Sequence, residues 1–170
     1  MPSTDVGGMA MRVQCKMSTG TATVAVFDPA CLQHRLEDTA DWWSDEDEEL
    51  QEINAGNVLF ASTHVDGGYA ITVDGSAAAE SDGGVRALLR CASGRFFVGA
   101  GEQVPAEGVL PDTNYGGGTY VEVGAGTYLV IVRHRVPGEL DVSITRADAE
   151  ARNGFTTSPE LPWPQVAGGR

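Results

Sequence analysis

The feature that most constrains the fold is an alternation of apolar and polar residues between positions 119 and 145. It runs in three segments, which are separated by a Gly-Ala-Gly turn at 124–126 and a Pro-Gly turn at 137–138. A period of two residues is typical of β-strands that bury one face. In the middle segment Leu129 and Ile131 add apolar side chains on the second face, which predicts a strand in the centre of a sheet.

The rest of the chain adds further short strand-like segments at 12–17, 21–27, 57–65, 69–73, 85–91 and 95–100. The segment at 21–27 is rich in β-branched residues, which favour strands. The Asp66-Gly67-Gly68 sequence between two of them is typical of a hairpin turn. Strands at this spacing predict a mainly β fold, either an antiparallel β-sandwich or a distorted barrel, of about eight strands.

Two short helices are expected after the early strand that ends at position 27. Asp28 can cap the first helix, which we expect over 29–38. The second helix follows Ser44, a good N-cap residue, and ends at Gly56, which suits the left-handed conformation that closes many helices. Both helices are therefore insertions into a β fold.

A chain of 170 residues is long enough for one domain with a hydrophobic core and short for two. We therefore predict a flexible lead at 1–11, a single β-sandwich domain at 12–150 and an extended tail at 151–170. The tail contains three prolines and shows no periodicity. Trp163, between two of these prolines, is the candidate residue for holding the tail on the domain.

Negative charge is concentrated in one segment. The net charge is −13, and residues 41–52 hold seven acidic side chains and no basic one. This polarity argues against nucleic acid and anionic membranes as partners, because both attract basic surfaces. On a helix Asp45, Glu48, Glu49 and Glu52 fall on one face and repel one another. No Lys or Arg lies between 37 and 80, so we expect this face either to be solvated or to bind a basic partner.

Two adjacent tryptophans, Trp42 and Trp43, precede the acidic helix. Adjacent side chains point in different directions whatever the backbone does. We therefore expect one ring to be buried near Leu50 and Ile53, and the other to remain available as an anchor for a partner.

No motif of catalysis or cofactor binding occurs in the sequence. The three histidines, His34, His64 and His134, have no partner at the spacing of a metal-ligand pair, and His34 is expected on the outer side of the first helix together with Arg35. The three cysteines suit reduced thiols, and the start of the chain has no apolar segment typical of a signal peptide. The sequence thus predicts a cytoplasmic protein that has no cofactor or metal and is not an enzyme.

Two segments resemble known proteins: FDPACLQHRLEDTADWWS with ELQEINAGNVLF at 27–60, and GAGTYLVIVRHRVPGELDVSI at 124–144. They are similar to a family of small uncharacterised bacterial β-rich proteins, some of which resemble immunity proteins of toxin systems. The likeness extends over about residues 20–146, with no motif specific to an activity. It implies a small, acidic, cytoplasmic protein, because many toxins that immunity proteins neutralise are basic nucleases. It assigns a role to no individual residue.

The leading hypothesis is a non-enzymatic protein-binding module, an immunity or antitoxin type of protein that neutralises a basic toxin through an acidic surface. Its partner-binding residues would be Trp42, Trp43, Asp45, Glu48, Glu49 and Glu52. One alternative is a small-ligand-binding sandwich, in which the long loop at 101–118 forms a lid with Tyr115 and Tyr120. Another is an enzyme of unrecognised type, which would require titratable groups in one cleft.

Overall fold

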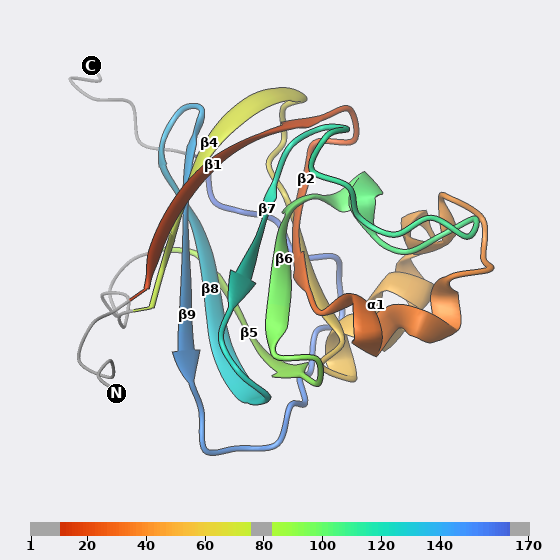
Figure 1. Ribbon diagram of the computed structural model, residues 1–170. Helices are drawn as coiled ribbons and strands as arrows, with labels where there is room; N and C mark the ends of the chain where they lie inside the picture. The colour runs from red at the N-terminus through yellow and green to blue at the C-terminus, as the bar shows by residue number, and fades with distance from the viewer. Residues whose placement is uncertain (1–10, 76–82, 164–170) are drawn as a thin grey trace.

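The computed structural model describes residues 11–75 and 83–163. In these described ranges nine strands form two sheets that pack face to face (Figure 1), so the predicted mainly β sandwich is confirmed. Within these residues the two sheets remain separate, and the fold is a sandwich rather than the distorted barrel. The flexible lead predicted at 1–11 lies outside the described residues except for Met11.

The five-stranded sheet has the order β1-β4-β9-β8-β5. Its strands are β1 (Arg12–Thr19), β4 (Gly67–Asp74), β5 (Val85–Cys91), β8 (Gly126–Val136) and β9 (Glu139–Arg146). The four-stranded sheet has the order β3-β2-β6-β7 and consists of β2 (Thr23–Phe27), β3 (Val58–Ser62), β6 (Arg95–Ala100) and β7 (Thr119–Glu122). β8 has a neighbour on each side, as its two apolar faces predicted.

One strand pair differs from the expected antiparallel arrangement, because β4 and β9 are parallel, with Ile71 opposite Leu140. The Asp66-Gly67-Gly68 turn was also predicted wrongly as a hairpin, since β3 and β4 belong to different sheets. A turn signal predicts that the chain reverses, but the choice of partner depends on which strand can bury the same face. β4 instead pairs with β1 from end to end, in antiparallel register.

Both predicted helical segments lie between β2 and β3. They are a 3-10 helix, η1 (Pro29–Arg35), and α1 (Glu46–Asn54), which follows a short 3-10 turn, η2 (Trp42–Ser44). Asp28 caps η1 as predicted, since its carboxylate accepts a hydrogen bond from the N–H of Ala30 at 2.9 Å. The same buried carboxylate accepts hydrogen bonds from the N–H groups of Ala92 and Ser93, both at 2.7 Å, and ties η1 to the β5–β6 turn. Gly56 follows α1 with a φ of 78°, as its predicted role requires.

Aromatic rings are buried on both faces of the four-stranded sheet. Phe27, Phe60, Phe96 and Phe97 are fully buried. Phe96 meets Tyr128 of β8 between the two sheets, whereas Phe60, on the opposite face, packs against the two tryptophan rings of η2. The rings of Phe27 in β2 and Phe97 in β6 lie 5.6 Å apart between centroids, so they join neighbouring strands of one sheet. Burial of such a side chain contributes about 1.5–3 kcal/mol to the free energy of folding. These rings therefore stabilise the sheets and the segments that pack on them.

The described part of the predicted C-terminal tail covers the side of the sandwich where β3 and β5 are edge strands. At β5 the side chain of Asn153 accepts a hydrogen bond from the N–H of Leu88 at 2.8 Å and donates to its carbonyl at 3.0 Å. At β3 the N–H of Ser62 donates to the carbonyl of Pro159, and its carbonyl accepts from the N–H of Leu161, both at 3.0 Å. Edge strands carry unpaired backbone groups, and this segment pairs such groups on both sheets.

We expect the Asn153→Ala substitution to lower the free energy of unfolding by about 1–3 kcal/mol, because it leaves the backbone groups of Leu88 without these partners. Arg152→Ala is the matched control, since the neighbouring side chain is 76% exposed and its removal should change little. Urea denaturation of the two variants measures the difference. Equal stabilities would mean that the segment does not hold the edge of β5.

Candidate protein-binding surface

Helix α1 has a different cap from the one that the sequence predicted. The cap is Asp45, whose carboxylate accepts hydrogen bonds from the N–H groups of Asp47 at 2.9 Å and Glu48 at 3.4 Å. Ser44 instead donates its hydroxyl to the carbonyl of Asp41 in the preceding turn. A carboxylate at this position both caps the helix and interacts favourably with its dipole. Asp45 is therefore fixed at the surface by the start of the helix.

Both tryptophans are buried, which corrects the expectation of one buried and one exposed ring. Trp42 is 6% exposed and Trp43 is 8% exposed. Trp43 stacks on Phe60, with ring centroids 5.0 Å apart, and Trp42 meets the same ring edge-on at 6.1 Å. Side chains that follow each other in a 3-10 turn differ in direction by about 120°, so both rings can reach the same part of the core.

The two indole N–H groups differ in their surroundings. The Nε1–H of Trp42 donates a hydrogen bond to the carbonyl of Pro105 at 3.1 Å and so attaches the loop after β6 to this segment. Among the described residues, Nε1 of Trp43 is buried without a hydrogen-bond partner. The first ring is therefore fixed by a polar contact as well as by packing, and the second by packing alone.

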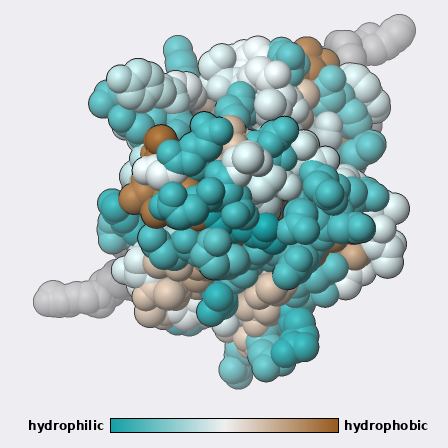
Figure 2. Space-filling view, turned by 90° about the vertical axis from the view of Figure 1, so that its right-hand side faces the viewer, coloured by the Kyte–Doolittle hydropathy of each residue, from teal (hydrophilic) through white to brown (hydrophobic). Residues whose placement is uncertain are grey.

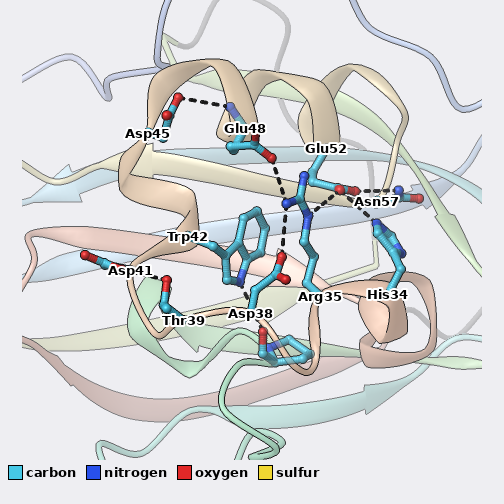
Figure 3. Close-up of polar contacts among 11 residues, drawn as sticks. His34, Arg35, Asp38, Thr39, Asp41, Trp42, Asp45, Glu48, Glu52 and Asn57 are labelled. Carbon is cyan, nitrogen blue, oxygen red and sulfur yellow. Dashed lines mark hydrogen bonds and ion pairs between the residues drawn. The ribbon is translucent and has the colours of Figure 1, made fainter.

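Arg35 lies beneath the acidic segment and not on the outer side of η1, where we expected it (Figure 3). Its side chain is 11% exposed and contacts the carboxylates of Glu52 at 2.7 Å, Glu48 at 2.7 Å and Asp38 at 3.1 Å. Its guanidinium also lies over the ring of Trp42, 4.5 Å from the centroid. Burial by itself lowers the pKa of Arg35, but the hydrogen bonds to the three carboxylates outweigh it and raise the pKa.

Arg35 thus supplies the compensating charge that the sequence between 37 and 80 lacks. The expectation of an uncompensated acidic face was wrong, because the base lies just before that range and reaches α1 from another helix. The signal was present in the sequence as the only Arg or Lys between Lys16 and Arg86.

Glu52 is the most buried acid of the segment, with a side chain 3% exposed. It accepts hydrogen bonds from Arg35 at 2.7 Å and from Asn57 at 2.8 Å, and it lies 2.8 Å from Nε2 of His34. Burial by itself raises the pKa of Glu52, but the hydrogen bonds from Asn57, His34 and Arg35 hold that pKa below its usual value. Glu52 is therefore an ionised anchor that joins α1 to η1.

Glu49 also points inward and is 8% exposed. Its carboxylate accepts a hydrogen bond from the hydroxyl of Ser158 at 2.5 Å, which brings the C-terminal segment against α1. Burial raises the pKa of Glu49; the hydrogen bond from Ser158 opposes the shift, and the charge of Glu46 adds to it. Since Ile53 packs in the core, the helix is covered on several sides, and the four predicted acids do not form one solvated face.

The exposed acids instead surround a hollow between η1 and the start of α1, which we call the acidic hollow. It has a volume of about 590 Å³ and is lined by Arg35, Glu37, Asp38, Thr39, Asp41, Trp42, Ser44, Asp45 and Glu48. Arg35 and Trp42 are its most buried members, so the carboxylates stand around a fixed base. Figure 2 shows that this side of the molecule is mostly hydrophilic.

An exposed apolar pair lies beside the acidic hollow, and the sequence analysis missed it. Val109 is 62% exposed and Leu110 is 48% exposed. The preceding backbone is hydrogen-bonded to the hollow's own segment, since the N–H of Glu107 donates to Asp38 at 2.9 Å and that of Gly108 to Leu36 at 2.7 Å. The sequence feature that could have predicted it is the pair of adjacent apolar residues inside a loop of Gly, Pro and acidic residues. A loop of this composition does not need an apolar pair for core packing.

No metal or membrane site emerges from the described parts of the chain. Across residues 11–75 and 83–163, no group of three or more His, Cys, Asp or Glu side chains is arranged to hold a metal ion. In the same ranges no helix is both long and apolar enough to cross a membrane.

The fold and the acidic hollow describe a β-sandwich protein with a helical insertion that carries much of its negative charge. The chain belongs to a family of unknown function, DUF6386, whose model matches residues 11–158. No curated protein matches its sequence.

Two solved structures share the fold. One is ComJ from Bacillus subtilis, an inhibitor of the DNA-degrading activity of NucA, with a TM-score of 0.53, 10% sequence identity and coverage of 82% of this chain and 99% of that one. The other is described as crocagin biosynthetic gene J, with a TM-score of 0.51, 12% identity and coverage of 81% and 97%. At these identities the likeness establishes the fold alone.

We expect Arg35→Met to lower the free energy of unfolding by about 3–5 kcal/mol at neutral pH, because it leaves the buried Glu52 without its cation. In the native protein the lowered pKa of Glu52 stabilises the fold above the unfolded pKa, and this contribution is lost as the pH falls. In the variant the carboxylate of Glu52 has lost its guanidinium partner and takes up a proton instead. The difference in free energy of unfolding between the native protein and the variant should therefore shrink as the pH falls toward about 4.5.

Chemical denaturation at the two pH values measures this difference. The double variant Arg35→Met with Glu52→Gln should recover part of the stability, because no buried charge remains. A loss that is independent of pH and is not recovered by the second substitution would mean that Arg35 acts through packing alone.

We expect Trp42→Ala and Trp43→Ala each to lower the free energy of unfolding by about 3–5 kcal/mol, since both rings are buried. Trp42→Phe should cost about 1 kcal/mol more than Trp43→Phe, because only Trp42 loses a hydrogen bond. Thermal and urea melts of the two Phe variants test this order. A reversed order would contradict the different roles of the two indole N–H groups.

Proposed function

We propose that this protein is a non-enzymatic inhibitor of the immunity type, which neutralises a basic toxin by binding it on the acidic hollow. The observation that carries the proposal is the combination of exposed carboxylates with an apolar pair at their edge. Protein interfaces commonly combine a solvent-accessible polar part with apolar contacts beside it. Five acidic side chains and one arginine line the hollow in the described part of the chain and give it a strongly negative character.

The Arg35 contacts support binding because they fix the carboxylates before a partner arrives. Asp38 and Glu48 each contact Arg35 and remain 40% and 44% exposed. They can therefore accept a second cation at their outer sides without first losing side-chain freedom, which lowers the entropy cost of association. Complementary charge would also steer a basic partner toward this side.

The residues first proposed for partner binding divide into two groups in this mechanism. Asp45 and Glu48 stand at the surface and would contact the partner. The buried residues Trp42, Trp43, Glu49 and Glu52 would act from beneath, by holding η1, η2 and α1 in place. The apolar contact that we had assigned to a tryptophan would come from Val109 and Leu110.

The shared fold with ComJ supports an inhibitor role without assigning a target. ComJ inhibits a nuclease, and the structural match extends over nearly the whole length of ComJ. A protein that inhibits a nucleic-acid-degrading enzyme meets a target that itself binds a polyanion, and such targets present basic surfaces. An acidic surface on the same fold is consistent with a partner of that class.

The alternative of a ligand-binding sandwich with a 101–118 lid has weaker support. Tyr115 is 76% exposed. Tyr120 packs against Phe97 and beneath the guanidinium of Arg95, which lies 4.0 Å from its ring centroid. One ring is therefore open to solvent, and the other is held by packing. The side chain of Gln103 instead donates hydrogen bonds to carbonyls of the loop, including that of Asp112 at 3.0 Å, and organises it.

The proposal predicts that a pull-down from the source cell at low salt recovers a basic protein whose activity this chain inhibits stoichiometrically. The double substitution Glu37→Lys with Asp41→Lys should slow association with that protein by about tenfold or more, because it reverses charge at the hollow. Val109→Asp should mainly speed dissociation, because it removes an apolar contact. Surface plasmon resonance at two salt concentrations separates the two rates.

The matched control is Asp148→Lys with Glu150→Lys, which changes the net charge equally at exposed positions outside the hollow. Equal losses in the control would mean that overall charge and not the acidic hollow attracts the partner. Recovery of no protein at low salt, or of one that binds without losing activity, would contradict the inhibitor role.

A further inference from the structure

A second hollow lies where the C-terminal segment crosses the end of the sandwich, and it has a different chemistry. It has a volume of about 440 Å³ and is lined by Thr63, Val65, Asp66, Gly68, Tyr69, His134, Pro137, Gly138 and Trp163. We call it the aromatic hollow. The turn between β8 and β9, which forms one wall, lies at the upper left of Figure 1, whereas α1 lies at the right.

Trp163 is exposed and yet firmly placed. Its side chain is 65% exposed, and its ring stacks on His64 with centroids 4.2 Å apart and planes 15° from parallel. The Nε2 of His64 lies 2.6 Å from the carbonyl of Leu161, and the Nδ1 of His134 lies 3.2 Å from the carbonyl of Pro162. Two histidines thus fix the backbone that presents this ring.

A second ring of the lining is also held in place. Tyr69 is 7% exposed, its hydroxyl donates to the carbonyl of Val65, and its ring lies 6.2 Å from that of His134. His64 has a φ of 71°, a left-handed conformation that a non-glycine residue adopts at a cost. The backbone is therefore strained at His64, the residue whose ring stacks on Trp163.

The charges around the aromatic hollow select among ligands. Among the described residues that line it, Asp66 is the charged one, and no Lys or Arg is present. An anion would meet this carboxylate and a net charge of −13. A cation that carries apolar groups would use both features, because aromatic faces attract cations and apolar groups pack on the same rings. The volume lies within the range of small-molecule sites, which is about 300–1,000 Å³.

We infer that the aromatic hollow binds a small organic cation of the quaternary ammonium class, with its alkyl groups against Tyr69 and Trp163 and its charge toward Asp66. This site is separate from the acidic hollow and does not depend on the proposed inhibitor role. The structure already holds the rings in place, so binding requires little rearrangement.

Choline chloride is the probe, and 3,3-dimethyl-1-butanol is its neutral isostere, with a carbon in place of the nitrogen. Tryptophan fluorescence follows binding, because Trp163 is exposed whereas Trp42 and Trp43 are buried. Choline should produce a saturable change that equal concentrations of sodium chloride do not. It should bind about tenfold more tightly than the isostere. Equal binding of the two would overturn the assignment to a cation.

Variants distinguish the site from general charge attraction. Binding to these variants is measured by the line broadening of the choline methyl signal in NMR. Asp66→Asn should weaken choline binding, and Trp163→Leu should abolish it. Tyr115→Ala, which removes an exposed ring elsewhere, should leave it unchanged. Thermal melts confirm that each variant is folded. Undiminished choline binding to folded Trp163→Leu would overturn the proposal.

A further arm separates two sources of the same chemistry. N-acetyl-trimethyllysine amide presents the cation as a protein side chain, and choline presents it as a free molecule. Tighter binding of the amide would support the cation site and assign its natural source to a partner protein, whereas tighter binding of choline would assign it to a small molecule. Saturable binding of neither would overturn the inference.

Discussion

The ion pair between Arg35 and Glu52 is the interaction on which the helical insertion depends. Two charges are removed from water here, which is favourable only when each is fully hydrogen-bonded. Arg35 achieves this with three carboxylates and an indole ring, and Glu52 with Asn57 and His34 in addition. Because its partners come from η1, α1 and the residue just before β3, the pair fixes the relative positions of these elements and therefore the shape of the acidic hollow.

The same contacts reconcile a strongly acidic surface with a stable fold. Repulsion among neighbouring carboxylates costs free energy, and a buried guanidinium offsets it from beneath while their outer sides remain open to solvent. The C-terminal segment plays the corresponding part for the sheets. It pairs backbone groups of the edge strands β3 and β5 and hydrogen-bonds Glu49 of α1, so it closes one side of the sandwich and also braces the helix.

The molecule therefore presents two surfaces of different chemistry on one scaffold. The acidic hollow is polar, rigid and bordered by the exposed Val109 and Leu110, features that suit a basic protein. The aromatic hollow is mostly apolar, has one carboxylate in its described lining and is shaped by Trp163. The acidic hollow is formed within the helical insertion, and the aromatic hollow where the C-terminal segment meets the β8–β9 turn. The strands themselves supply the rigid support for both.

The sequence by itself determined the strands, the two helical segments and the concentration of charge, because alternation, caps and composition are local properties that appear in neighbouring residues. It also predicted the central place of β8 from the apolar residues on both of its faces. Sheet membership, the parallel β4–β9 pair, the burial of both tryptophans and the inward direction of Arg35, Glu49 and Glu52 were decided only by the tertiary structure. Each of these depends on a partner that is distant in the sequence, such as Ser158 for Glu49 or β9 for β4, and a local pattern carries no information about which distant group will satisfy a buried charge or a strand edge.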